Sequence, residues 1–214
     1  MNRFNSLKHM LVRQWQQYRL KEFEFDFLFD PVPEDEYVCF DCETTGLNPK
    51  KDKILTLSAV KIKGNNVLAG ESLDLVVQHS GQIHEDSIKV HQLRHLDVQG
   101  GVDEIEAMRR FLYFIGSRPL VGYYLEFDVE LVNRLIKPWL SIVLPNPQIE
   151  VSELFYDYQL KSQYHSPYMP NIDLSFERIL EQLALPNLGQ HNAKNDAMMT
   201  ALAFLKLKSL SARE

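Results

Sequence analysis

The sequence Tyr37-Val38-Cys39-Phe40-Asp41-Cys42-Glu43-Thr44-Thr45-Gly46-Leu47 begins as an apolar strand and ends in two carboxylates followed by a glycine turn. Because side chains alternate between the two faces of a strand, Asp41 and Glu43 are predicted to point the same way. Two like charges side by side repel each other unless a cation lies between them. Hard divalent cations such as Mg²⁺ prefer carboxylate oxygens. The pattern therefore predicts half of a metal site at a strand end, and the alternative is a pair of solvated acids at a turn.

The length and composition indicate a soluble globular protein. The chain has 214 residues, of which 45% are hydrophobic and 24% are charged, enough for one full domain plus an extension or for two small domains. No apolar run is long enough for a membrane-spanning helix, and the N-terminus lacks the apolar core of a secretory signal. The net charge of −6 is unusual for a protein that binds nucleic acid. Bound cations would, however, neutralise part of an acidic cluster.

The only two cysteines, Cys39 and Cys42, are separated by two residues. A zinc site would need a second pair of ligands, which no other cysteine supplies. A thioredoxin-like motif normally opens a helix, whereas these cysteines lie in a strand pattern. We therefore expect buried free thiols, which favours a reducing, cytoplasmic setting.

Residues 1–33 are predicted to form an N-terminal extension. Residues 1–21 are basic, and apolar residues at helical spacing predict a short amphipathic helix that either covers the domain or docks a partner. Phenylalanines at every second position from 23 to 29 predict an extended segment. This segment would be an added edge strand or a surface for a protein partner or for self-association. The prolines at 31 and 33 then break regular structure, so the main domain is predicted to span residues 34–210.

The remaining chain predicts an α/β fold. Strand patterns at 36–43, 54–62 and 67–78 are joined by short turns and indicate an antiparallel meander. Asp103 with Glu106 is a capping pattern for a helix that runs to Ile115. Further on, the expected elements are strands at 119–123 and 148–151 and helices at 127–136, near 154, at 174–183 and at 193–208. We expect the helix at 127–136 to stop at Pro138. This order suggests a mixed five-stranded sheet flanked by helices.

Three further polar residues lie at predicted element ends. Asp128 follows the short strand at 119–123, and His191 and Asp196 lie at the start of the last helix. Helical side chains lean toward the N-terminus, so Asp196 can point back toward the loop that holds His191. Taken singly, each acid is also a common residue for the first turn of a helix.

Together, three separated motifs resemble the DnaQ-like DEDDh family of 3′–5′ exonucleases, which includes the epsilon proofreading subunit of bacterial DNA polymerase III and ribonuclease T. The motifs are Phe40-Asp41-x-Glu43-Thr44-Thr45-Gly46, then Val121-Gly122 leading to Phe127-Asp128, then His191-Asn192-Ala193-x-x-Asp196-Ala197. The resemblance covers residues 36–208. It implies a ribonuclease-H-like fold and hydrolysis assisted by two Mg²⁺ or Mn²⁺ ions.

The resemblance also implies residue roles. Asp41, Glu43 and Asp196 would hold one metal ion, and Asp41 with Asp128 would hold the other. His191 would be the general base that deprotonates the attacking water, which suits a histidine at physiological pH. The terminal nucleotide would lie against Thr44, Thr45, Gly46 and Phe127. The products would be nucleoside 5′-monophosphates.

The chain departs from the family pattern at Tyr123-Tyr124, where many relatives have His-Asn. These tyrosines either stack on a base or pack beneath the strand. His91 and Arg94, in a segment that resembles the family's cleft border, are candidates for phosphate contacts. The expected substrate is DNA with a single-stranded 3′ end, in proofreading or DNA repair. The alternatives are an exoribonuclease and a non-catalytic subunit that binds a polymerase or nucleic acid.

Overall fold

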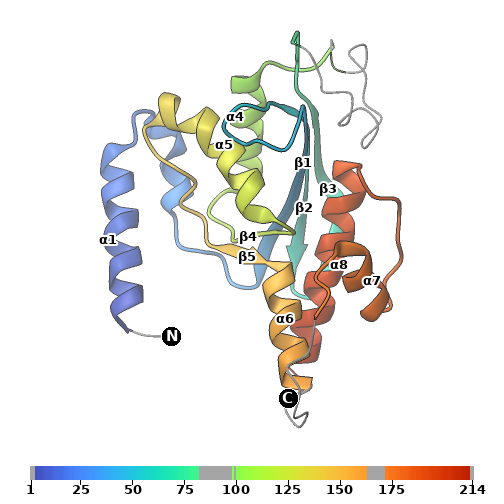
Figure 1. Ribbon diagram of the computed structural model, residues 1–214. Coiled ribbons are helices and arrows are strands. Elements are labelled where there is room, and N and C mark those ends of the chain that lie inside the picture. Colours follow the sequence, from blue (N-terminus) through green and yellow to red (C-terminus); the bar gives the residue numbers. More distant parts are fainter. Residues whose placement is uncertain (1–2, 82–97, 99, 163–171, 213–214) are drawn as a thin grey trace.

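The computed structural model describes residues 3–81, 98, 100–162 and 172–212, with side chains described from residue 10 onward. A five-stranded sheet with the order β3-β2-β1-β4-β5 lies at its centre (Figure 1). The strands are β1 (Glu36–Thr44), β2 (Ile54–Lys63), β3 (Asn66–Val76), β4 (Leu120–Gly122) and β5 (Gln148–Glu150). The first three strands form the predicted antiparallel meander, and β4 and β5 add in parallel. The expected mixed sheet flanked by helices is confirmed.

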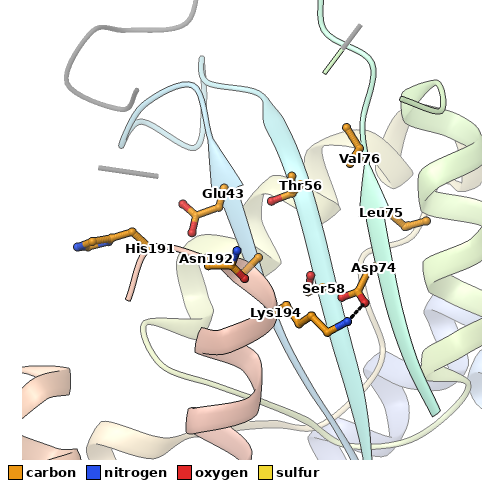
Figure 2. A pocket seen from close by; sticks show the side chains of 10 residues that line it. Glu43, Thr56, Ser58, Asp74, Leu75, Val76, His191, Asn192 and Lys194 are labelled. Atoms are coloured by element: carbon orange, nitrogen blue, oxygen red, sulfur yellow. Dashed lines mark hydrogen bonds and ion pairs between the residues drawn. The ribbon is translucent and has the colours of Figure 1, made fainter. Parts of the chain in front are cut away.

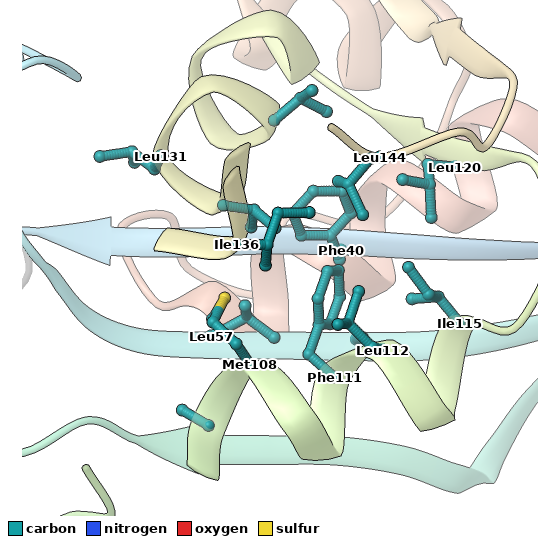
Figure 3. Packing of buried hydrophobic residues seen from close by; sticks show 14 of the residues in the cluster. Phe40, Leu57, Met108, Phe111, Leu112, Ile115, Leu120, Leu131, Ile136 and Leu144 are labelled. Atoms are coloured by element: carbon teal, nitrogen blue, oxygen red, sulfur yellow. The ribbon is translucent and has the colours of Figure 1, made fainter. Parts of the chain in front are cut away.

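Helices cover both faces of the sheet. One face packs on α4 (Glu104–Ile115), α5 (Leu125–Leu140) and the short 3₁₀ helix η1 (Phe23–Phe29). The other face packs on α6 (Val151–Ser162), α7 (Phe176–Gln182) and α8 (Ala193–Ser211). Figure 3 shows the first of these cores, where Phe40 of β1 meets Phe111 of α4 at a ring separation of 4.9 Å. The expected cap of α4 is present, because Asp103 accepts the backbone N–H groups of Ile105 and Glu106.

The side chains of β1 point alternately into the two cores on either side of the sheet. Val38, Phe40 and Cys42 face the core beneath α4 and α5. Cys39 faces the core beneath α8, so Asp41 and Glu43 lie on the α8 side of the sheet. Both cysteines are buried and free, as expected. The sheet thus carries the two acids at the end of its central strand, facing the start of α8.

The prediction of an extended segment at 23–29 is wrong, because these residues form η1. Phe25, Leu28 and Phe29 are buried at a spacing of three and four residues, which a helical turn provides and a strand does not. The Phe25 ring packs edge-on against Trp139 of α5, with 5.0 Å between centroids. Burial of these side chains against α5 therefore favours a helical turn, although the alternation of phenylalanines in the sequence is typical of a strand.

The expected stop of α5 at Pro138 is also wrong. The helix begins at Leu125, includes Pro138 and ends at Leu140. A proline this close to a helix end removes a single backbone hydrogen bond. Leu140 is fully buried, Trp139 packs on Phe25, and the N–H of Ser141 closes the helix on the carbonyl of Lys137. These contacts hold the last turn in place.

The first helix, α1 (Arg3–Arg19), lies at the edge of the molecule beside η1. The Arg13 guanidinium donates to the carbonyls of Pro145, Leu28 and Asp30 at 2.9, 3.1 and 2.8 Å. Several apolar side chains of α1 remain exposed, namely Met10, Leu11, Val12, Trp15 and Tyr18. Partner binding or self-association through this extension stays a prediction. None of the helices in the described ranges is both long and apolar enough to span a membrane.

Replacing Phe25 with alanine is expected to lower the free energy of unfolding by about 3–5 kcal/mol, the usual cost of emptying a buried phenylalanine site. Phe25 is fully buried, whereas Phe23, two residues away, is 83% exposed. Phe23→Ala is therefore the matched control and should change stability by less than about 0.5 kcal/mol. Urea denaturation of both variants measures the difference. A loss that is no larger for Phe25→Ala than for Phe23→Ala would show that burial of Phe25 does not stabilise the fold.

Candidate active site

Three carboxylates meet where β1 ends and α8 begins. Asp41, Glu43 and Asp196 each place an oxygen so that all three oxygens lie within 4.8 Å of one another. Asp41 and Glu43 come from alternate positions of β1, and Asp196 comes from the first turn of α8. The structure thus brings together residues that are more than 150 positions apart in the sequence. Such an arrangement of oxygen ligands suits a hard divalent cation.

The two oxygens of Asp196 have different surroundings. Oδ2 accepts the backbone N–H groups of His191 and Asn192 at 2.8 and 3.2 Å. Oδ1 is buried and has no hydrogen-bond partner among the described residues. A buried carboxylate oxygen is costly to leave without a partner. A metal ion held by the three acids would supply the missing interaction, so the residues present fit such an ion.

The electrostatics of the cluster are those of like charges crowded together. Burial, and then the charges of Asp128, Asp196 and Glu43, hold the pKa of Asp41 well above its usual range. Burial and the charge of Asp196 raise the pKa of Glu43 to about 7. Burial also raises the pKa of Asp196, although the N–H groups that it accepts oppose this shift. A cation would reverse this repulsion.

Asp128 lies in the first turn of α5, is 4% exposed and lines the same cavity as the three acids. Burial raises its pKa, and hydrogen bonds with Cys42 oppose that rise. The start of α5 is fixed from β5, because Oε2 of Glu150 accepts the N–H of Leu125 at 2.9 Å. The Oε1 atom of Glu150 accepts both the N–H and the hydroxyl of Ser152. Glu150 thereby orients the helix turn that presents Asp128.

His191 lies in the loop before α8 and borders the cavity. Its backbone has a φ of +65°, a left-handed conformation that is uncommon outside glycine. The loop keeps this shape because Asp196 accepts the N–H of His191 and because the Asn192 side chain caps the N–H of Asn195. The residue is exposed to solvent at the edge of the cavity.

The loop between β1 and β2 is built around Asp52, which is buried. Its Oδ1 accepts the Thr45 hydroxyl at 3.0 Å, and its Oδ2 accepts the N–H of Asn48 at 2.8 Å. A Cβ atom at Gly46 would lie 2.6 Å from the Asp52 carboxylate, so the loop requires glycine there. The Thr44 hydroxyl donates to the carbonyl of Gly46 at 2.6 Å. The threonine hydroxyls thus shape the loop, which leaves backbone groups as the candidates for substrate contact.

Tyr123 and Tyr124 have different environments. The Tyr123 hydroxyl donates to the carbonyl of Leu174 at 2.9 Å, and its ring stacks on Phe176 with 4.8 Å between centroids. Tyr123 thus packs against the start of α7, which is closer to the predicted packing role than to the predicted stacking on a base. Tyr124 is 69% exposed at the rim of the cavity. Both tyrosines line the cavity, and Tyr124 is the more exposed of the two, so Tyr124 is the better placed to stack on a base.

The cavity itself has a volume of about 260 Å³. It joins the acids Asp41, Glu43, Asp128 and Asp196 with His191 and with apolar side chains of Leu47, Tyr124, Phe127 and Phe176. A lining that combines acids with aromatic rings suits a ligand with a charged group and a flat apolar group. His91 and Arg94 lie outside the described residues.

Sequence reasoning missed several residues around the site. Asp52 accepts the N–H of Asn48, four residues before it, and Glu150 accepts the N–H of Leu125, which is 25 residues before it; nothing in their local sequence indicates either contact. Leu47 follows the glycine turn and is almost fully exposed at the cavity. An exposed leucine directly after the acidic strand was the one available signal.

The sheet order, with acids at the end of the central strand, defines a ribonuclease-H-like exonuclease fold. Residues 38–204 match the RNase_T exonuclease family, so the chain belongs to this family of DnaQ-like exonucleases. Among similar proteins is the DNA polymerase III subunit epsilon of Aquifex aeolicus, 25% identical over 179 residues, with 83% of each chain covered. An epsilon-like protein of Rhodobacter capsulatus is 30% identical over 185 residues, which cover 86% of this chain and 25% of the relative.

Another relative is the PolC-type DNA polymerase III of Clostridium perfringens, 27% identical over 179 residues. The matched region is 82% of this chain and only 12% of that polymerase. Among solved structures, E. coli exonuclease I in complex with single-stranded DNA has a TM-score of 0.68 at 15% identity, with 85% of this chain and 42% of that chain covered. Cell-death related nuclease 4 has a TM-score of 0.67 at 13% identity, with 84% and 65% covered. At these identities the structures establish the fold.

Proposed function

We propose that this protein is a metal-dependent 3′–5′ exonuclease that hydrolyses phosphodiester bonds at single-stranded DNA 3′ ends and releases nucleoside 5′-monophosphates. The observation that carries the proposal is the buried, unpartnered Oδ1 of Asp196 within the three-carboxylate cluster. Membership in the exonuclease family and similarity to epsilon subunits support it. The solved complex of exonuclease I with single-stranded DNA supports this choice of substrate.

The metal ligands in this proposal are the four acids. Asp41, Glu43 and Asp196 would hold one Mg²⁺ or Mn²⁺ ion, and Asp41 with Asp128 would hold a second. Two divalent ions would stabilise the attacking and leaving oxygens of an in-line displacement at phosphorus. Asp128 is less exposed than the other three acids and does not belong to the close oxygen cluster. A ligand role through an intervening water suits that placement.

The protein's own groups orient the reactants. His191 is the base that accepts the proton of the attacking water, because it is an exposed imidazole beside the acids. Tyr124 and Phe127 line the same cavity and give the terminal base an aromatic surface. Backbone groups of Thr44, Thr45 and Gly46 contact the terminal nucleotide in this arrangement, on a loop that Asp52 holds in shape.

The proposal is tested by incubating the protein with single-stranded DNA and RNA of the same sequence, with Mg²⁺, with Mn²⁺ and with a chelator. We expect metal-dependent shortening that is faster for DNA. Faster cleavage of RNA would instead identify an exoribonuclease, because the metal chemistry does not depend on the 2′-hydroxyl and cleft contacts decide the choice. The absence of divalent binding by calorimetry, together with the absence of cleavage, would identify a non-catalytic binding subunit.

A further inference from the structure

A second hollow, of about 300 Å³, adjoins the cavity that holds the four acids. Figure 2 shows it over the faces of β2 and β3, beside the start of α8. Glu43 and His191 line both spaces, so the two meet at the proposed site of hydrolysis. Thr56, Ser58, Asp74 and Lys194 line only this second space.

The floor of this hollow continues the row of metal ligands across the sheet. Ser58 of β2 lies opposite Asp41, and Thr56 lies opposite Glu43. Asp74 of β3 lies opposite Ser58. Because cross-strand partners project from the same face, the two hydroxyl side chains lie beside the acids rather than beneath them. The floor thus carries hydroxyl groups that can donate hydrogen bonds, among apolar side chains such as Leu75 and Val76.

Lys194 brings a positive charge over this floor. It lies in the first turn of α8, and its Nζ atom reaches across β2 to Oδ2 of Asp74 at 2.6 Å (Figure 2). The Lys194 side chain is 62% exposed, so two of its three N–H donors remain available to a ligand. The N-terminal end of α8 adds partial positive charge at the same place. The hollow therefore combines hydroxyl groups, an ammonium group and a helix N-terminus, which suit a phosphate. It also holds the carboxylates of Glu43 and Asp74, of which Asp74 is paired with Lys194.

We propose that this hollow binds the nucleotide that precedes the terminal one, with Lys194 contacting the phosphate on the 5′ side of that nucleotide. The inference rests on the proposed exonuclease function. In this arrangement the terminal nucleotide lies against Tyr124 and Phe127, the scissile phosphate lies at the acids, and the rest of the strand passes Glu43 and His191, the two residues that both spaces share. The adjoining hollow begins at those two residues. Asp74 holds the lysine over the path of the strand.

The test is Lys194→Gln, with steady-state kinetics on a single-stranded DNA oligonucleotide. We expect KM to rise roughly tenfold, as for loss of a charged hydrogen bond, with kcat nearly unchanged. The dependence of log KM on log salt concentration should flatten by about 0.7, the value for one phosphate contact to a single strand. Lys206→Gln is the matched control, because Lys206 is an exposed lysine on the same helix, outside both cavities. This control should leave KM and the salt dependence unchanged.

Asp74→Asn separates phosphate binding from a merely structural ion pair. Both Lys194→Gln and Asp74→Asn break the pair, so a structural role would raise KM equally in the two variants. Phosphate binding predicts that Asp74→Asn does not raise KM, because it removes a negative charge and leaves the ammonium group in place. An unchanged KM and salt dependence in Lys194→Gln, with an active wild type, would overturn this inference alone. An inactive wild type would overturn the proposed function.

Discussion

Asparagine in place of Asp41 is expected to lower the rate of hydrolysis at the DNA 3′ end by at least about 10³-fold, because metal ions supply several kcal/mol of transition-state stabilisation. Asp41 is the acid shared between the two proposed metal ions. Asparagine keeps its shape and removes its charge. The fold should survive, since the metal-free cluster crowds like charges together and the substitution relieves part of that repulsion.

Thermal unfolding with and without Mn²⁺ provides a second readout for this variant. Ligands that bind only the folded state raise its stability, by about 2.7 kcal/mol at a concentration one hundred times the dissociation constant. Wild type should show this shift and Asp41→Asn should lose most of it. Asp157→Asn, at an exposed acid on α6, is the matched control and should keep both the shift and the activity. Full activity in Asp41→Asn would rule out the proposed metal site.

His191→Asn is expected to lower kcat by about 10²–10⁴-fold, the usual contribution of a general base. Asparagine is the suitable replacement, because among residues with a side chain it is one of the few that tolerate the left-handed backbone of His191, and it has no imidazole. The Asp196 contact to the backbone N–H at position 191 does not involve the imidazole, so the metal cluster should remain intact.

Kinetics and metal-dependent unfolding together test the role of His191. We expect kcat to fall while the Mn²⁺-dependent thermal shift stays at the wild-type level. Loss of that shift would mean that His191 supports metal binding instead of accepting a proton. A kcat within threefold of wild type would remove His191 from the proposed mechanism.

Much of the fold was predictable because local patterns and packing agree. The alternation of β1 survives intact, since its even-numbered residues from Val38 to Cys42 face one core and Cys39 faces the other. The errors occur where tertiary packing opposes a local pattern. Phe25 packs against Trp139 in the core. This contact favours the helical turn η1 over an extended segment, and it stabilises the last turn of α5 beyond Pro138.

For the candidate site, the sequence supplied the residue types and the structure supplied their proximity. Asp41 and Glu43 share a face by strand geometry, but nothing in their spacing brings Asp196 within 4.8 Å. The supporting groups were beyond sequence reasoning, because Asp52 and Glu150 act through backbone N–H groups whose positions depend on the finished fold. Tyr123 and Tyr124 are adjacent and identical in type, yet the fold half-buries Tyr123 against Phe176 and leaves Tyr124 exposed.

The most direct test of the proposed function is the product pattern from a single-stranded DNA oligonucleotide labelled at its 5′ end and incubated with the protein and Mg²⁺. A 3′–5′ exonuclease produces labelled fragments that shorten one nucleotide at a time, with unlabelled nucleoside 5′-monophosphates released from the other end. We predict this ladder, and its disappearance with a chelator. Release of the label as a mononucleotide at the start of the reaction, or an intact oligonucleotide, would contradict the proposal.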